Sequence, residues 1–341
     1  MSIPSFQKIN YLLRPNKQIE RKIFIEIIRS LEHKFNFNIE NSTYIGMGSI
    51  YYYDFLLFHK YLKIRNLISI DDKTQFKERF KFNLPYDYID FFNLKTTEFL
   101  STKFKKMSSD SKIDESNYLI WFDYDSKLIT KIENIKRKEF IIDPSKVDDI
   151  RIIINKCSEN DIFILTVDVD YRDSFFLTTE LRQTFIETFE KYLSKKYRNI
   201  NNIIIENLTN IIQDVIINII RSEEKYNKFK FKKLFSFEYK DTKKMYTLGG
   251  IFHSKNIKRK MRDINYTNLN EDEIIKISVP NLTYKEKIKL DSLVKSFSEI
   301  DYAAKNDDEI HKILGFEIDR NELENYIDYY KYYPQYYEGI I

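Results

Sequence analysis

Residues 44–72 decide the fold, and they read YIGMGSIYYYDFLLFHKYLKIRNLISIDD. The chain has six glycines in 341 residues, and two of them, Gly46 and Gly48, stand two apart after a short β-rich run. A helix-like pattern follows over residues 49–62, with apolar side chains at helical spacing. Residues 66–72 then form a second apolar run that ends in acid. The stretch predicts a strand, a glycine turn, a helix starting near Ser49 and a second strand.

The same strand pattern returns twice further along the chain. YLIWFDYD (118–125) and DIFILTVDVD (161–170) are apolar runs that end in acid, and the segments 127–138 and 145–157 between them are helix-like. Residues from about 175 to 226 are helical in pattern. Strands that alternate with helices predict an α/β fold with a doubly wound, mostly parallel sheet.

Residues 233–252 interrupt this alternation, because two β-rich runs flank the turn-prone DTKK and predict an antiparallel hairpin. We therefore expect three parts. They are a helical N-terminal segment (1–42), a doubly wound domain that ends in the hairpin (43–255) and a mostly helical C-terminal extension (256–341).

Composition limits the class of protein. Hydrophobic residues make up 43% of the chain, which is enough for a core, and charged residues of both signs make up 32%. Cys157 is the only cysteine, which excludes an intramolecular disulfide and a cysteine-based zinc site. Neither a signal peptide nor a membrane-spanning run is recognisable, so we expect a soluble, cytoplasmic protein with no membrane partner.

The glycine turn has the setting of a nucleoside-binding site. Glycines permit a tight turn and let a ligand approach the backbone, and the start of the following helix offers unpaired amides. Asp71 lies 25 residues after Gly46, at the end of the next strand, where a carboxylate can accept both hydroxyls of a ribose. The alternative is a tight turn with no ligand, and an Asp71 that merely caps the chain.

Two missing sequence motifs limit which cofactor the site could bind. A dinucleotide fingerprint needs a third glycine, and Tyr51 stands there instead, which disfavours NAD and FAD. The chain contains no GxxxxGK[ST] phosphate loop. A hairpin after the parallel strands suits the sheet of S-adenosylmethionine-dependent methyltransferases, in which a reversed strand is inserted near the edge.

Several segments carry a resemblance to a known family. They are INYLLRPNKQIERK (9–22), the 44–71 stretch, RFKFNLPYDYI (79–89), YLIWFDYD (118–125) and MYTLGGIF (245–252). Together they resemble a family of bacterial proteins labelled O-methyltransferases, some of which occur among phage-defence genes. The resemblance implies a Rossmann-like class I methyltransferase fold with S-adenosylmethionine as cofactor.

The resemblance also implies roles for individual residues. Those assigned to the cofactor are Gly46, Gly48, Ser49, Asp71 and Tyr124. The segment from Asp123 to Asp125 would face cofactor and substrate, and Asp123 and Asp125 are the candidate catalytic residues. The fourth strand lacks the [DNS]-P-P-[YF] motif of amino-methyltransferases that act on bases, which argues against base methylation by the usual route.

Acidic strand ends suggest a metal site. Asp123, Asp125, Asp168 and Asp170 end two runs that would be neighbours in the sheet, and such oxygens could hold Mg²⁺. A single aspartate could instead act as a base. The alternative is that these residues cap helices or face solvent.

Other ionisable side chains have simpler interpretations. His59 lies about three turns beyond the glycine turn, so a packing role is favoured over catalysis. Arg14, Lys17, Arg21 and Lys22 could clamp an anion, but a solvated helix face is favoured.

Two basic segments interleave cations with aromatic or apolar residues: KFKFKK (228–233) and KNIKRKMR (255–262). Stacking combined with phosphate neutralisation would bind nucleic acid. A half-buried edge strand explains the first segment equally well, and the net charge of the chain is only +4.

The sequence leaves three hypotheses about function. The first is a methyltransferase that acts on an oxygen or nitrogen of an unknown small-molecule or macromolecular acceptor. The second is a catalytically silent module of the same fold that binds a nucleotide, a protein partner or a second copy in an antiviral defence cassette. The third is an enzyme that modifies nucleic acid.

Overall fold

The computed structural model describes residues 14–104, 117–131, 140–142, 144–171, 178–270, 272–299 and 306–335. The chain divides into two compact units. The larger one, the sheet unit, comprises Ile25–Glu238 and Lys243–Ile275. The other, the terminal unit, combines the chain up to Phe24 and from Lys276 with the short segment Tyr239–Thr242. The units therefore interleave along the sequence and do not follow one another as consecutive segments.

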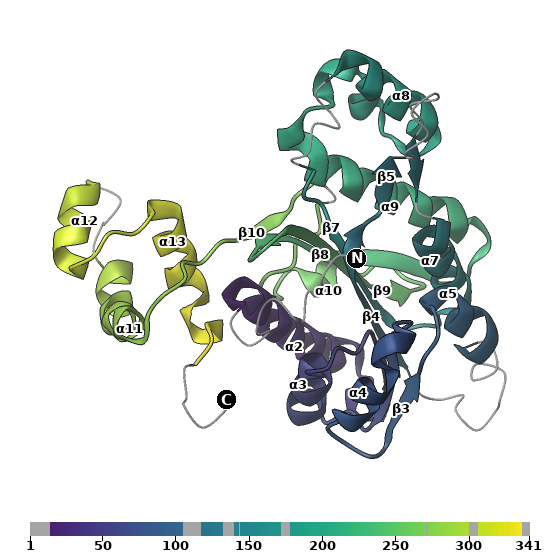
Figure 1. Cartoon of the computed structure of the whole chain (residues 1–341), viewed down its shortest axis with the longest axis horizontal. Helices are drawn as coiled ribbons and strands as arrows, with labels where there is room; N and C mark the ends of the chain where they lie inside the picture. Colours follow the sequence, from purple (N-terminus) through teal and green to yellow (C-terminus); the bar gives the residue numbers. More distant parts are fainter. Residues whose placement is uncertain are drawn as a thin grey trace. The chain divides into compact units, whose positions relative to one another are not determined.

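An eight-stranded sheet organises the fold (Figure 1). In spatial order its strands are β3 (Ile89–Phe92), β2 (Asn66–Ile70), β1 (Thr43–Gly46), β4 (Tyr118–Lys127), β7 (Ile162–Asp168), β9 (Lys244–His253), β8 (Lys230–Lys240) and β10 (Ile275–Ile277). The first five pair in parallel, and β9 runs antiparallel to β7. A reversed strand is thus inserted near one edge, which confirms the predicted fold class and the hairpin expected at 233–252.

Helices fill most of the connections. They are α2 (Pro15–Phe35), α3 (Tyr53–Leu62), α4 (Lys77–Phe82), α5 (Thr96–Phe99), α7 (Pro144–Lys156), α8 (Thr179–Phe189), α9 (Leu208–Glu223), α10 (Lys258–Met261), α11 (Tyr284–Glu299), α12 (Asp307–Leu314) and α13 (Arg320–Tyr329). The helix predicted over 145–157 is confirmed by α7. Among the described helices, none joins the length and the apolar character that crossing a membrane requires.

The prediction of a helix over 127–138 is wrong for residues 129–131, which form a strand. Strand β5 (Ile129–Lys131) pairs antiparallel with β6 (Phe140–Ile142) as a separate ribbon, and residues 132–139 lie outside the described part of the chain. Isoleucine and threonine favour extended backbone because they branch at the β-carbon.

Side chains from both faces of the sheet are buried, as a parallel sheet requires. On one face, Ile45 and Phe122 join a hydrophobic cluster with Ile150 of α7 and Ile216 of α9. On the other face, the ring of Phe58 in α3 lies 4.8 Å from that of Tyr44 and 6.1 Å from that of Trp121. This burial explains why the strands read as continuous apolar runs.

The basic residues near the N-terminus do not form a solvated face. Lys17 is 1% exposed, and its ammonium group contacts the carboxylate of Glu20 at 2.9 Å and the hydroxyl of Tyr239 at 2.9 Å. Arg21 is 2% exposed. The prediction is wrong because these cations are buried inside the terminal unit, where Lys17 meets a partner more than 200 positions away in the sequence.

Candidate active site

The carboxyl ends of the parallel strands bring together most of the predicted site residues. Gly46 ends β1, Asp71 directly follows β2 and Asp168 ends β7. In the register of the sheet, Gly46 pairs with Trp121 of β4, two positions before Asp123. Because parallel strands end at the same edge, these residues share the edge at which open α/β sheets bind ligands.

The turn after β1 differs from the prediction. Helix α3 begins at Tyr53 and not near Ser49. The Ser49 hydroxyl accepts a hydrogen bond from the amide of Tyr51 at 3.2 Å, and its carbonyl accepts one from the amide of Tyr52 at 3.2 Å. Tyr52 is left-handed, with φ of 44°. Serine thus closes a local turn on its own side chain, which delays the helix.

The two glycines make room for the protein's own side chains. A β-carbon at Gly46 would lie 2.2 Å from the hydroxyl oxygen of Tyr44. A β-carbon at Gly48 would lie 2.2 Å from the hydroxyl oxygen of Ser69 and 2.8 Å from the ring of Tyr52. Close packing therefore explains both glycines, whereas the sequence suggested close approach of a ligand. Their contact with a cofactor stays a prediction.

Asp71 is held rigidly but keeps one oxygen available. Its Oδ1 accepts from the amide of Lys73 at 2.8 Å, and its carbonyl accepts from the side chain of Asn93 at 2.7 Å. Oδ2 has no hydrogen-bond partner among the described residues. Burial raises the pKa of Asp71 to about 6, and the charge of Asp125 contributes in the same direction. The carboxylate is ionised at neutral pH and can accept further hydrogen bonds.

The Tyr124 hydroxyl bonds to helices on one face of the sheet. It donates to the buried Asp149 of α7 and lies 3.1 Å from the hydroxyl of Thr96 in α5. Thr96 also donates to Asp149 at 2.5 Å. These bonds tie β4 to two helices, so the Tyr124 hydroxyl is used inside the fold. Asp123 points to the opposite face, because side chains alternate along a strand. The register of β4 against β7 shifts between Asp123 and Lys127, so this alternation does not extend to Asp125.

Lys243, from the turn between β8 and β9, reaches the same edge. Its ammonium group lies 3.2 Å from Oδ2 of Asp168 and donates to the carbonyl of Asp125 at 3.2 Å. The other oxygen of Asp168 accepts from the amide of Asp170 at 2.7 Å. A lysine therefore neutralises the carboxylate that the sequence assigned to a metal.

The predicted Mg²⁺ site finds no support. Within the described parts of the chain, no three histidine, cysteine, aspartate or glutamate side chains are grouped so that they could hold a metal ion. Asp123, Asp125 and Asp168 share an edge but are not a ligand set, since Asp168 already has a cation and a backbone amide as partners.

Three contributors to this edge were missed by the sequence analysis. Asn93 follows a strand that was too short to recognise. Asp149 sits in the middle of an unremarkable helix. Lys243 could have been found, because a hairpin whose second strand runs antiparallel beside β7 places its turn at the carboxyl end of β7.

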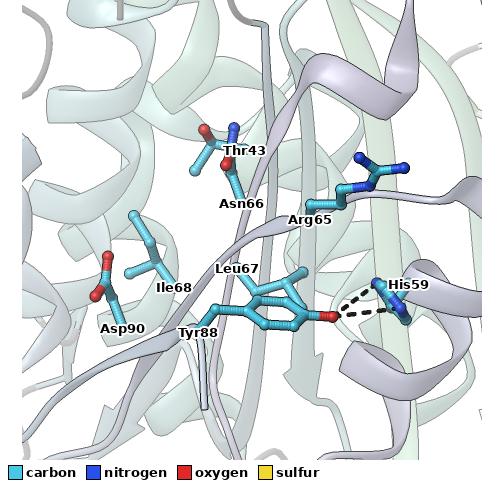
Figure 2. A pocket seen from close by; sticks show the side chains of 8 residues that line it. All are labelled: Thr43, His59, Arg65, Asn66, Leu67, Ile68, Tyr88 and Asp90. Carbon is cyan, nitrogen blue, oxygen red and sulfur yellow. Dashed lines mark hydrogen bonds between the residues drawn. The ribbon is translucent and has the colours of Figure 1, made fainter. Parts of the chain in front are cut away.

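A cavity of about 630 Å³ lies at the other edge, by the amino ends of β1 and β2 (Figure 2). It is lined by Thr43, His59, Arg65, Asn66, Leu67, Ile68, Tyr88 and Asp90. The Nδ1 atom of His59 lies 2.9 Å from the carbonyl of Ile64 and 3.2 Å from the hydroxyl of Tyr88. His59 thus bonds within its own fold, and it is remote from the edge that carries Asp71.

Comparisons with known proteins define the family. No curated protein matches the sequence. Among solved structures, one of a LepI variant "in complex with SAH and substrate analogue" is similar over 62% of this chain and 43% of that chain, with 9% identity and a TM-score of 0.31. The present chain thus spans less than half the length of that protein, and so weak a likeness carries no argument about function.

The family model described as "Putative O-methyltransferase" matches residues 9–341. This match confirms the O-methyltransferase family named in the resemblance, while the bacterial origin and the phage-defence context stay predictions. It agrees with the predicted class of enzyme, a methyltransferase, while S-adenosylmethionine as the donor and the identity of the acceptor stay predictions. The chain belongs to this O-methyltransferase family.

Proposed function

We propose that the protein transfers the methyl group of S-adenosylmethionine to a hydroxyl oxygen, with the donor held at the carboxyl edge of the sheet. Asp71 carries this proposal. Its buried carboxylate directly follows the second strand, with one oxygen fixed by the Lys73 amide and the other without a partner among the described residues. A carboxylate at that position is suited to accept both hydroxyls of a ribose. Family membership supports an oxygen acceptor.

The residues present fit the donor at its ribose end. Asp71 offers a fixed, ionised acceptor there. At the glycine turn the fit is of another kind, because Tyr44, Ser69 and Tyr52 occupy the places that the missing side chains leave. The turn would therefore bind the donor through its backbone groups, since the protein's own side chains fill the space beside the two glycines.

When bound, the donor supplies an electrophilic methyl carbon on a positively charged sulfur. The acceptor oxygen forms a bond to that carbon while the bond from sulfur to carbon breaks, and the hydroxyl proton passes to a base. Asp123 lies on the face of β4 opposite to Tyr124, and the charge of Asp125 acts on Asp71; either carboxylate would take that proton. Most of the rate enhancement would come from positioning, which needs few obligatory side chains.

Isothermal titration calorimetry of the full chain tests the donor site. We expect S-adenosylmethionine and S-adenosylhomocysteine to bind at one site and NAD and ATP not to bind. Asp71→Asn keeps an acceptor for the Lys73 amide but loses the charge, so donor affinity should fall at least tenfold, about 1.4 kcal/mol. Asp72→Asn changes an exposed neighbour and serves as the matched control. Equal affinities of both variants, or binding of NAD or ATP alone, would contradict the proposal.

The acceptor can be found with a methyl-labelled donor. Protein and labelled S-adenosylmethionine are added to a cell extract, which is then separated by size and analysed for the labelled bond. We expect the label on oxygen. Label on nitrogen would correct the acceptor class, and absence of label from every fraction, with the donor bound, would contradict catalysis.

A further inference from the structure

Two basic segments that are distant in the sequence meet at one cavity of the sheet unit. The cavity holds about 330 Å³ and lies between the end of α9, the first residues of β8 and the start of α10. Its charged lining residues are Arg221, Glu224, Lys232, Lys233 and Lys258. KFKFKK (228–233) and KNIKRKMR (255–262) both contribute, and the donor site uses neither of them.

The lining is strongly positive. It contains four cations and one carboxylate, whereas the whole chain has a net charge of only +4. Lys233 is held by the carbonyls of Asn270 and Glu273, at 3.0 and 3.1 Å. Lys232 and Lys258 form no ion pair with any of the described residues. These cations are therefore available to an anionic ligand.

The floor of the cavity is apolar. It is made by Ile217, Ile220, Phe231, Ile257 and Leu269. The ring of Phe231 packs 5.5 Å from that of Phe252 on one side and remains partly exposed. Further cations are close in the sequence to the lining residues, at Lys228, Lys230, Lys255, Arg259 and Arg262. An aromatic and aliphatic lining combined with four lining cations suits a base with its flanking phosphates.

We propose that this cavity, named here the basic cavity, binds single-stranded nucleic acid, with one base on the apolar floor and the phosphates on the surrounding cations. A volume of about 330 Å³ is at the low end for a ligand pocket of about 300–1,000 Å³, so it has room for one nucleotide. The bases of a duplex are stacked and paired, and cannot enter such a cavity.

The basic cavity is separate from the donor site. β8 runs antiparallel to β9 and hence parallel to β7, so its first residues lie at the amino edge of the sheet, opposite to Asp71. A strand bound there would leave the carboxyl edge open. The proposal therefore stands or falls independently of methyl transfer.

Fluorescence anisotropy without S-adenosylmethionine tests it, with labelled 12-nucleotide oligouridine and oligothymidine, a duplex of the same length and increasing salt. We expect both single strands to bind at low salt and the duplex to bind at least tenfold more weakly. With about three phosphates neutralised, the slope of log K against log salt concentration should be about −2. Arg221→Ala/Lys232→Ala/Lys258→Ala should weaken binding at least tenfold and bring that slope close to zero.

Lys60→Ala/Lys103→Ala removes two exposed lysines elsewhere in the sheet unit and should bind within twofold of the wild type. If the triple variant fails to fold, Lys258→Glu alone replaces it in the test, because this residue is exposed. We expect the single variant to weaken binding too. A preference for one oligonucleotide over the other would identify RNA or DNA as the ligand. Equal binding of the duplex, unchanged binding by both cavity variants, or binding to anionic vesicles without binding to oligonucleotides would overturn the proposal.

Discussion

Each edge of the sheet holds a buried aspartate. The two carboxyl groups have similarly raised pKa values but differ in their hydrogen-bond partners. Burial raises the pKa of both Asp71, at the carboxyl edge, and Asp161, at the amino edge, to about 6. Both oxygens of Asp161 are used, since they accept from the amides of Tyr118 and Ser158 at 2.7 Å each. Asp71 has one such partner, the amide of Lys73 at 2.8 Å.

This difference shows that a shifted pKa does not by itself mark a functional site. Structural carboxylates and functional ones are desolvated in the same way, so both titrate near the same pH. What separates them is the unused hydrogen-bonding capacity. At the amino edge the fold gives each carboxylate oxygen of Asp161 a backbone amide as partner. At the carboxyl edge one oxygen of Asp71 is left for a ligand, and burial of this oxygen without a partner lowers the stability of the folded protein.

The largest expected effect is at the amino edge. Asp161→Ala leaves the buried amides of Tyr118 and Ser158 without their acceptor, and each such loss is worth about 1–3 kcal/mol. We expect the free energy of unfolding, measured in urea at pH 7.5, to fall by about 2–4 kcal/mol. Asp161→Asn should fall between the variant and the wild type, because its carbonyl can satisfy one of the two amides.

A loss below about 1 kcal/mol for Asp161→Ala would break the comparison. It would mean that the two amides find other partners, and that the amino edge is no more dependent on its carboxylate than the carboxyl edge is.

At the carboxyl edge, removal of the negative charge of Asp71 should raise the stability of the protein, whereas loss of the Asp161 carboxylate should lower it. The pKa of Asp71 rises from an ordinary value of 3.8 to about 6, so the folded state binds the proton more tightly than the unfolded state does. Stability from this group is therefore fully present below pH 4 and is lost as the pH rises through 6, by up to about 3 kcal/mol. Asp71→Asn stays neutral and escapes this loss.

We expect Asp71→Asn to be more stable than the wild type at pH 8, by about 1–3 kcal/mol, and to lose this advantage at pH 4. Urea denaturation at several pH values between 4 and 8 measures both limits. A variant that is less stable than the wild type at pH 8 would show that the Asp71 carboxylate holds the fold together, as Asp161 does.

The order of the elements was accessible from the sequence because it depends on local patterns. Apolar runs that end in acid marked β2, β4 and β7, and a turn-prone DTKK between two β-rich runs marked the hairpin. Asp71 could be placed at a strand end for the same reason. A side chain's position along a strand is set by its neighbours in the sequence, and parallel strands bring their ends to one edge.

The contacts of the site residues were not accessible, because they depend on distant partners. Nothing local shows that Tyr124 bonds to Asp149, 25 positions away, or that Lys17 meets Tyr239, 222 positions away. The packing around Gly48 was not accessible for the same reason, since Ser69 from the next strand fills the space beside it. Packing between elements decided each of these cases.

The smallest expected effect concerns Lys243, the cation of the carboxyl edge. Its ammonium group lies 3.2 Å from Asp168, but the lysine side chain is 54% exposed, so water screens the pair. Lys243→Met keeps the length of the side chain and removes its charge. We expect the free energy of unfolding in urea to fall by less than about 1 kcal/mol, because exposed ion pairs contribute about 0–1 kcal/mol. A loss above about 2 kcal/mol would show that this edge, like the amino edge, depends on its polar contacts for stability. Only the unused oxygen of Asp71 would then distinguish the carboxyl edge from the amino edge.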